Sequence, residues 1–389
     1  MATSIYGQKS SFSASDANLR INIEDLITRY EDYKFPILKR LNGSIFKKDV
    51  LSHKYEWSEQ DLRPVKAGVV NQITAAGASV AVDAAGVFKV DDVAMNPRTL
   101  EKVLVTAQSG AGTLLTIERG FEGTLAAIMV ESDELVRVGT AAPEGARSGE
   151  GLTLDGDDLY NYTQIFKDIV EMSDGQFKGF IRGDETKTDA IQRVQQELME
   201  GLASSILVGN RYRNAAQKRS TLGGIKNMVD TYAPDNAIDF GGAGTWGTDL
   251  GALNKLEDAV QALALKMGGK PTVYASYKAL RKVRVLQDDT VRTTRSDTTR
   301  GIGVVDTLAS GMGDLDIVQV IDRTGVMDDF IFLVDESKVG YKARKGRGWF
   351  VEEKPFNGDG HVIQVLGEYT LKVSAPKASI AYLHNLGVA

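Results

Sequence analysis

The sequence predicts an α+β protein that carries a small all-β module, and three features indicate this fold class. Short strand-like runs crowd the region from about 65 to 142, an amphipathic helix pattern covers 187–210, and strand and helix patterns alternate beyond residue 250. The length of 389 residues is enough for two to three domains of about 150 residues each.

The composition excludes several classes of protein. The chain has 46 basic and 52 acidic residues, a net charge of −6, and 42% hydrophobic residues, which is typical of a folded protein rather than a disordered one. The longest apolar run, Leu125 to Val130, is far shorter than the roughly 20 residues of a membrane helix. The first twenty residues also lack the apolar core of a signal peptide. We therefore expect no membrane association.

The residue types that most often carry catalysis are scarce. The chain has no cysteine and only three histidines, His53, His361 and His384, none of which has a second ligand at metal-binding spacing. Carboxylate doublets such as Asp157-Asp158 fit solvated turns better than a hydrolase site, because neighbouring residues of a strand point to opposite faces. The sequence therefore predicts no enzyme, no cofactor and no metal site.

The first sixty residues predict few regular elements. Residues 1–20 have no hydrophobic period and are expected to form a mobile or extended arm. Apolar residues at helical spacing over 23–30 predict a short helix, which Pro36 should end at or before Phe35. Residues 54–62 alternate as in a half-buried strand, with Tyr55 and Trp57 on one face.

The region from about 65 to 142 predicts a small antiparallel barrel or sandwich. Its strand-like runs are about five residues long and are separated by glycine-containing turns. The alternation that supports these strands comes from three pairs of apolar residues: Phe88 and Val90, Val103 and Val105, and Leu115 and Ile117.

The rest of the chain mixes helices and strands. Over 187–210 an apolar stripe at helical spacing predicts a helix of roughly 35 Å. A second amphipathic helix is expected at 253–269 and a basic one at 277–286. Residues 161–172 are expected to form a strand or a strand that leads into a helix, and further strands are expected at 271–276, 314–321, 328–335, 340–344 and 362–376.

Two aromatic residues are candidates for contacts with another subunit. Trp57 and Phe121 lie in polar, glycine-rich surroundings, where they fit either the core of a small domain or an anchor in a partner's pocket. We take them, with their neighbours, as candidate intersubunit contact residues: Tyr55, Trp57, Arg119, Phe121 and Glu122.

Two basic runs are candidates for nucleic-acid contact. Residues 281–300 have six basic and three acidic residues, and residues 338–347 have five basic and none acidic. Either run fits a solvated, salt-bridged face or a weak, sequence-independent contact with DNA, since neither has interleaved aromatic residues for base stacking. The candidate DNA-facing residues are Arg281, Lys282, Arg284, Lys342, Arg344, Lys345 and Arg347.

The order of these parts resembles a tailed-bacteriophage major capsid protein with the Hong Kong 97-type fold. The sequence is more narrowly similar to the SU-ten-type major capsid protein family through six stretches that span most of the chain. These are HKYEWSEQDL (53–62), VFKVDDV (87–93), LLTIERGFEGT (114–124), PEGARSG (143–149), NYTQIF (161–166) and TLGGIKNMV (221–229).

The resemblance implies a division of the chain. Residues 1–53 would be the N-arm and 54–160 the E-loop, a long β-hairpin here enlarged by the small β-module. Residues 161–224 would form the P-domain with the spine helix at 187–210. Residues 225–325 would be the A-domain, and 326–389 would return as P-domain strands.

The resemblance also implies a function. The chain would assemble with copies of itself, as hexamers and pentamers, into the icosahedral shell that encloses the double-stranded DNA of a tailed phage. Its partners would include portal and scaffolding proteins, with weak non-specific contact to packaged DNA. It would be made in the bacterial host cytoplasm and reside in the virion. A tail-tube or decoration subunit is the alternative, against which the long helix and the α+β C-terminal half argue.

Overall fold

The computed structural model divides the chain into two compact units. One contains residues 58–159 and the other contains 1–57 with 160–389. The structure describes residues 35–41, 45–60, 62–109, 112–145, 156–173, 187–241, 250–267, 270–281, 307–310, 313–320, 325–355, 358 and 360–387. The short helix expected at 23–30 lies outside these residues.

The smaller unit contains a six-stranded antiparallel sheet that closes on itself. The bridge between Val69 and Val82 joins the two edge strands, so the sheet becomes a small barrel. In sheet order the strands are β2 (Lys66–Gly68), β7 (Glu134–Thr140), β4 (Asp92–Met95), β5 (Lys102–Ser109), β6 (Leu114–Glu118) and β3 (Ser79–Ala81).

Strand alternation fills the barrel, with one exception to the predicted pattern. Val103 and Val105 of β5 and Leu115 and Ile117 of β6 point inward and are buried, as predicted. The expected strand through residues 88–90 is wrong. That segment is a loop that buries the Phe88 side chain, whereas Val90 is 47% exposed.

The larger unit contains a mixed six-stranded sheet. Its strands are parallel between β12 and β20 and between β13 and β15, and antiparallel elsewhere. In sheet order they are β12 (Ala237–Asp239), β20 (Ile380–His384), β16 (Ile331–Val334), β13 (Thr272–Ser276), β15 (Gly313–Val320) and β14 (Thr307–Ser310).

The two faces of this sheet are covered by different helices. Val273 and Ala275 face helix α5 (Leu250–Met267), whereas Tyr274 between them faces a second core that includes α4 (Ile225–Tyr232). Because successive side chains of a strand alternate, one short strand contributes to both cores. Three short helices lie around this sheet: α7 (Pro376–Ser379), η6 (Pro234–Asn236) and η7 (Val326–Asp329).

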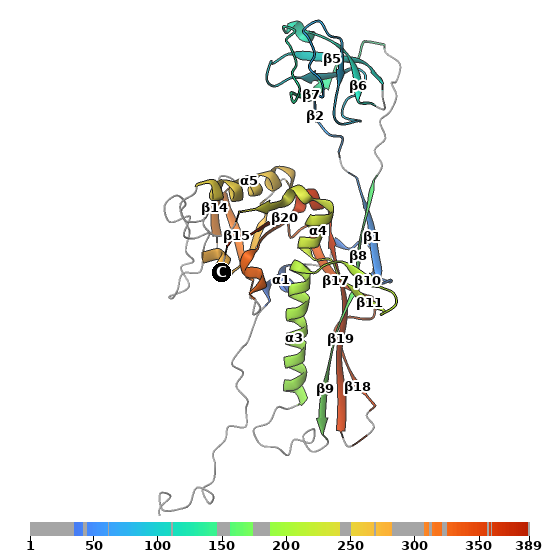
Figure 1. Cartoon of the computed structure of the whole chain (residues 1–389). Helices are drawn as coiled ribbons and strands as arrows, with labels where there is room; N and C mark the ends of the chain where they lie inside the picture. The colour runs from blue at the N-terminus through green and yellow to red at the C-terminus, as the bar shows by residue number, and fades with distance from the viewer. Residues whose placement is uncertain are drawn as a thin grey trace, which may run out of the picture. The chain divides into compact units, whose positions relative to one another are not determined.

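A second sheet of this unit supports the long helix α3 (Lys187–Val208), which corresponds to the helix predicted at 187–210. Strand β19 (Gly360–Val373) pairs with β9 (Gln164–Ser173) over ten residues. On its other side β19 pairs with β17 (Val339–Ala343) and β18 (Phe350–Lys354). The apolar stripe of α3 packs on β9 and β19, and Figure 1 shows the helix running along them.

Two two-stranded ribbons lie outside these sheets. Strand β1 (Lys54–Glu59) pairs with β8 (Asp157–Tyr162), and the boundary between the two units falls within this ribbon. Strand β10 (Tyr212–Asn214) pairs with β11 (Arg219–Thr221).

Helix α1 (Pro36–Arg40) was not predicted from the sequence. Pro36, which was expected only to end a preceding helix, is the first residue of α1. Proline suits this position because its missing N–H would have no partner in the first turn. Of the basic helix expected at 277–286, the structure describes a helical segment at 277–281.

Candidate assembly surfaces

The aromatic candidates of β1 lie against the core of the larger unit. Trp57 is half-buried and packs on that core. Tyr55 lies between Phe46 and Trp57, with ring-centre distances of 5.0 and 6.0 Å, and the Lys372 Nζ lies 6.0 Å from the Trp57 ring. The Trp57 ring therefore contributes to its own fold and leaves only part of its surface for a partner.

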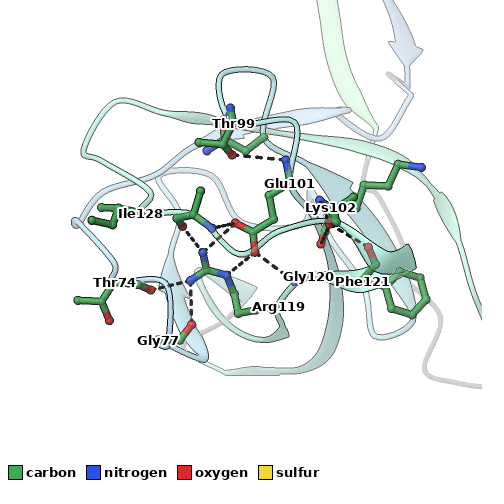
Figure 2. Close-up of polar contacts among 12 residues, drawn as sticks. Thr74, Gly77, Thr99, Glu101, Lys102, Arg119, Gly120, Phe121 and Ile128 are labelled. Atoms are coloured by element: carbon green, nitrogen blue, oxygen red, sulfur yellow. Dashed lines mark hydrogen bonds and ion pairs between the residues drawn. The ribbon is translucent and has the colours of Figure 1, made fainter.

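Arg119 lies within a polar network of the barrel unit (Figure 2). Its Nε and Nη2 donate to the Glu101 carboxylate at 2.7 and 2.8 Å, and the two side chains are 9% and 0% exposed. Its Nη1 donates to the carbonyl oxygens of Thr74 and Gly77 at 2.7 and 3.1 Å, and its Nη2 also donates to that of Ala127. All five N–H donors of the guanidinium are thus used within the unit.

The Glu101 carboxylate also fixes the backbone that follows Arg119. It accepts hydrogen bonds from the backbone N–H groups of Gly120 and Ala127 at 3.2 and 3.1 Å. Burial by itself would raise the pKa of the Glu101 carboxyl, but the bonds from Arg119 and from these two N–H groups lower it below its ordinary value. Glu101 is therefore a buried anion that holds the segment 119–127.

A second carboxylate–arginine pair holds the far end of the same segment. Asp133 accepts bonds from Arg98 Nε and Nη2 at 2.6 and 2.7 Å, from Asn96 Nδ2 at 2.9 Å and from the Val130 N–H at 2.9 Å. Arg98 in turn donates to the Ile128 carbonyl at 2.8 Å. The hydrogen bond from Arg98 is the main reason why the pKa of Asp133 lies well below its usual range.

Between these two pairs, the segment 120–130 presents apolar side chains to solvent. Leu125 and Ile128 are 89% and 50% exposed, and Phe121, in the single turn η5 (Phe121–Gly123), is half-buried. Gly120 has φ of 65°, and a Cβ there would lie 2.8 Å from the Thr124 carbonyl, so only glycine fits this turn. Glu122 is exposed and forms an ion pair with Lys102.

The basic candidates of 342–347 are paired with carboxylates of the same unit. Lys342 and Lys345 lie 3.0 and 3.3 Å from Asp49. Arg344 and Arg347 lie 3.2 and 3.1 Å from Glu368, whose side chain is 2% exposed. Arg281 is exposed, and Lys282 and Arg284 lie outside the described residues.

The described residues offer no group of three histidine or carboxylate side chains able to hold a metal ion. Among the same residues, no helix has the length and apolar character needed to cross a membrane.

Comparison with known families identifies the chain. The model of the SU10 major capsid protein family matches residues 4–386. The chain belongs to this family. It is therefore a phage major capsid protein, and the tail-tube or decoration alternative is not favoured. Among curated proteins, no match was found.

One solved structure supports the fold. A structure from Microbacterium phage Oxtober96 is similar with a TM-score of 0.53 and 11% identity, covering 95% of this chain and 96% of that one. A capsid of an empty GTA particle gives a TM-score of 0.42 and 16% identity, covering 65% and 81%. A holo-SrpI encapsulin complex from Synechococcus elongatus PCC 7942 gives a TM-score of 0.42 and 14% identity, covering 61% of this chain and 79% of that one. The shared fold rests on the first of these.

Two of the stretches that carried the resemblance meet inside this major capsid protein. Asn161, which is fully buried, donates through Nδ2 to the carbonyls of Gly223 and Leu371, each at 2.9 Å. Its Oδ1 accepts from the Gly223 and Tyr162 N–H groups, each at 2.8 Å. The sequence did not predict this joint, because NYTQIF and TLGGIKNMV lie far apart in the chain and no local pattern links them.

Proposed function

We propose that this major capsid protein assembles with copies of itself, as hexamers and pentamers, into an icosahedral shell with the Hong Kong 97-type organisation. The match of the family model over residues 4–386 carries this proposal. The shell encloses double-stranded DNA, and its formation involves separate portal and scaffolding proteins. The protein is made in the host cytoplasm and functions in the virion.

In this organisation each part of the chain has a structural role. Helix α3 is the spine helix, the ribbon of β1 and β8 is the base of the E-loop, and the barrel is inserted in that loop. Residues 1–53 are the N-arm, 225–325 the A-domain and 326–389 the returning P-domain strands. The long pairing of β9 with β19 beneath α3 supports the P-domain assignment.

The candidate contact residues have different roles in this proposal. Tyr55 and Trp57 contact a neighbouring subunit through the parts of their rings that their own core leaves exposed. Phe121 and Glu122 contact a neighbour from the segment 120–130. Arg119 contributes indirectly, because its donors hold that segment in place.

Contact between the shell and DNA is weak in this proposal. Lys342, Arg344, Lys345 and Arg347 have acidic partners, which reduces the free positive charge that they offer to phosphates. With the exposed Arg281, and with Lys282 and Arg284, they provide salt-sensitive and sequence-independent contact. The net charge of −6 is consistent with a wall that does not grip the packaged DNA.

Negative-stain microscopy of the purified chain, alone and with its scaffold, tests the proposed function. We expect closed icosahedral shells. Tubes would support a tail protein instead, and a uniform monomer under both conditions would contradict the proposal.

A further inference from the structure

The ribbon of β10 and β11 is an exposed, purely basic element of the larger unit. Residues 209–225 contain four basic residues and no acidic one. Arg213, Lys218 and Arg219 are exposed, and Tyr212 beside them is 55% exposed. An isolated two-stranded ribbon is marginally stable, so its position has to come from its base.

Hydrogen bonds fix that base to the rest of the unit. Ser220 Oγ donates to the Thr163 carbonyl at 2.6 Å, and the Leu222 N–H donates to Gln164 Oε1 at 3.1 Å. Arg211 Nη1 donates to the Tyr160 carbonyl at 2.8 Å, and its guanidinium lies 4.0 Å from the centre of the Tyr160 ring. The ribbon is therefore held at its root while its turn faces solvent (Figure 1).

The charges of the ribbon are not compensated within the described part of the chain. No described carboxylate forms an ion pair with Arg211, Arg213, Lys218 or Arg219. Arg211 is occupied by a carbonyl and by the Tyr232 hydroxyl, and Arg213 lies 6.0 Å from the ring of Tyr162. This contrasts with the basic residues of 342–347, which all have acidic partners.

The smaller unit has the opposite character. Residues 58–159 contain sixteen acidic and eight basic residues, a net charge of −8, whereas the remaining residues contain thirty-six acidic and thirty-eight basic, a net charge of +2. Several of these acids are exposed and form no ion pair with a described residue. They are Glu118, Glu131, Glu144 and Asp157.

We propose that the ribbon of β10 and β11 is a docking site for the acidic unit 58–159 of a second copy of this chain. The proposal rests on the self-assembly proposed above and adds a specific electrostatic contact to it. Complementary charge brings the two surfaces together and sets their orientation, and the exposed Tyr212 adds apolar contact area.

Duplex DNA is the other polyanion that this ribbon could meet, but the charges favour the second copy. DNA would encounter a chain with a net charge of −6, whereas each copy in an assembly supplies both a basic ribbon and a unit of net charge −8. The ribbon also has only one strongly exposed ring, Tyr212, which is too few for stacking along a nucleic acid.

Neutralising the ribbon provides the first test. The triple variant Arg213→Gln, Lys218→Gln, Arg219→Gln is compared with the control Lys47→Gln, Lys48→Gln, Lys167→Gln, which removes the same charge from exposed lysines elsewhere in the larger unit. Assembly of the full chain is followed by light scattering from about 50 to about 500 mM NaCl.

We expect the ribbon variant to need a roughly tenfold higher chain concentration for assembly at low salt, and to lose most of the salt dependence of the wild type. The control should behave as the wild type. Equal effects in both variants, or normal assembly of the ribbon variant, would overturn the proposal. If the ribbon variant assembles normally but no longer binds a labelled DNA duplex, the ribbon is a nucleic-acid surface and the proposal is also overturned.

Cross-linking identifies the partner surface directly. Because the chain has no cysteine, Ala216→Cys places one thiol in the exposed turn without changing its charges. A maleimide photo-cross-linker on this thiol, in particles assembled from mixed heavy- and light-isotope chains, should form links between copies that map to residues 58–159.

Links confined to one chain, links to other regions, or no link in assembled particles would contradict the docking site. Shells that form normally while the links map elsewhere would refute this inference alone. Failure of the wild-type chain to form shells would instead refute the proposed function.

Discussion

At the scale of single residues, the barrel unit depends on two buried carboxylates, Glu101 and Asp133, that are each paired with an arginine. Glu101 and Asp133 are each surrounded by an arginine and by backbone or amide donors. A buried carboxylate is tolerated only when such donors replace its water, and removing one partner leaves an uncompensated charge. These pairs therefore hold the backbone of 119–130 in place.

The substitution Glu101→Gln should destabilise the barrel. It removes the charge opposite the nearly buried Arg119, a change that costs about 3–5 kcal/mol when one partner of a buried pair is lost. Hydrogen exchange of peptides from 58–159 is the suitable measurement, because no tryptophan lies in that unit. The amides of Gly120 and Ala127 should lose protection first.

Lys102→Gln is the matched control, since Lys102 pairs with the exposed Glu122 and such pairs contribute about 0–1 kcal/mol. Equal losses of protection in Glu101→Gln and Lys102→Gln would contradict the structural role assigned to Glu101.

The same carboxylates predict how the barrel responds to acid. The pKa values of Glu101 and Asp133 lie below their ordinary values of 4.5 and 3.8 in the folded state. Their contribution to stability is therefore complete above those ordinary values and is lost as the pH falls toward the lower folded pKa values. Exchange protection of 58–159 should hold from pH 7 to about 5 and then decline steadily.

In Asp133→Asn the decline should be smaller, because that side chain no longer titrates. An acid response identical to that of the wild type would show that Asp133 does not contribute.

The residue-scale predictions succeeded where a pattern was local and failed where a partner was distant in sequence. Val103, Val105, Leu115 and Ile117 alternate along their strands, and their burial follows directly from that period. Arg119 gave no sign of its partner, because Glu101 directly precedes β5 and Arg119 directly follows β6, so the two meet only when these strands pair.

At the scale of elements, the long helices and several short strands were predictable, whereas the short helices were not. The apolar stripe of α3 extends over enough turns to predict the helix. Helix α4 has eight residues and α1 has five, so their patterns are too short to separate from strands or loops. Tertiary contacts with the core of the larger unit stabilise both.

The joint between β8 and the turn before α4 yields an element-scale prediction. Asn161→Ala removes the amide donors to the Gly223 and Leu371 carbonyls and the acceptor of the Gly223 N–H, and it leaves these buried backbone groups without partners. Each such group costs about 1–3 kcal/mol, so the larger unit should lose about 2–4 kcal/mol of unfolding free energy. Urea unfolding followed by tryptophan fluorescence measures this loss.

Asn210→Ala serves as the control, because this asparagine is exposed and lies in the same unit. It should change the unfolding free energy by less than about 0.5 kcal/mol. If Asn161→Ala unfolds at the same urea concentration as the wild type, the joint does not support the fold.

At the scale of the whole molecule, the chain has features that one copy does not use. The segment 120–130 exposes Leu125 and Ile128 although its backbone is firmly held, and the basic residues of the ribbon of β10 and β11 form no ion pair with a described carboxylate. A preorganised exposed surface reduces the ordering cost of association. Both features therefore favour assembly from identical copies, which is what membership of a major capsid protein family requires.

Trp57→Ala and Phe121→Ala together test whether the aromatic candidates contact a neighbour. Truncating an aromatic anchor at an interface costs about 2 kcal/mol or more, so each variant should need a roughly 30-fold higher chain concentration to assemble. Tyr277→Ala, at a tyrosine that is 56% exposed and has no proposed contact, should assemble as the wild type does. Sedimentation separates shells from subunits, and circular dichroism reports whether the subunits remain folded.

Because Trp57 also packs on its own core, an unfolded Trp57→Ala subunit would assign Trp57 to that core. Phe121→Ala alone would then test whether an aromatic residue contacts the neighbour. Normal assembly of folded Phe121→Ala and Trp57→Ala subunits would remove both residues from the interface.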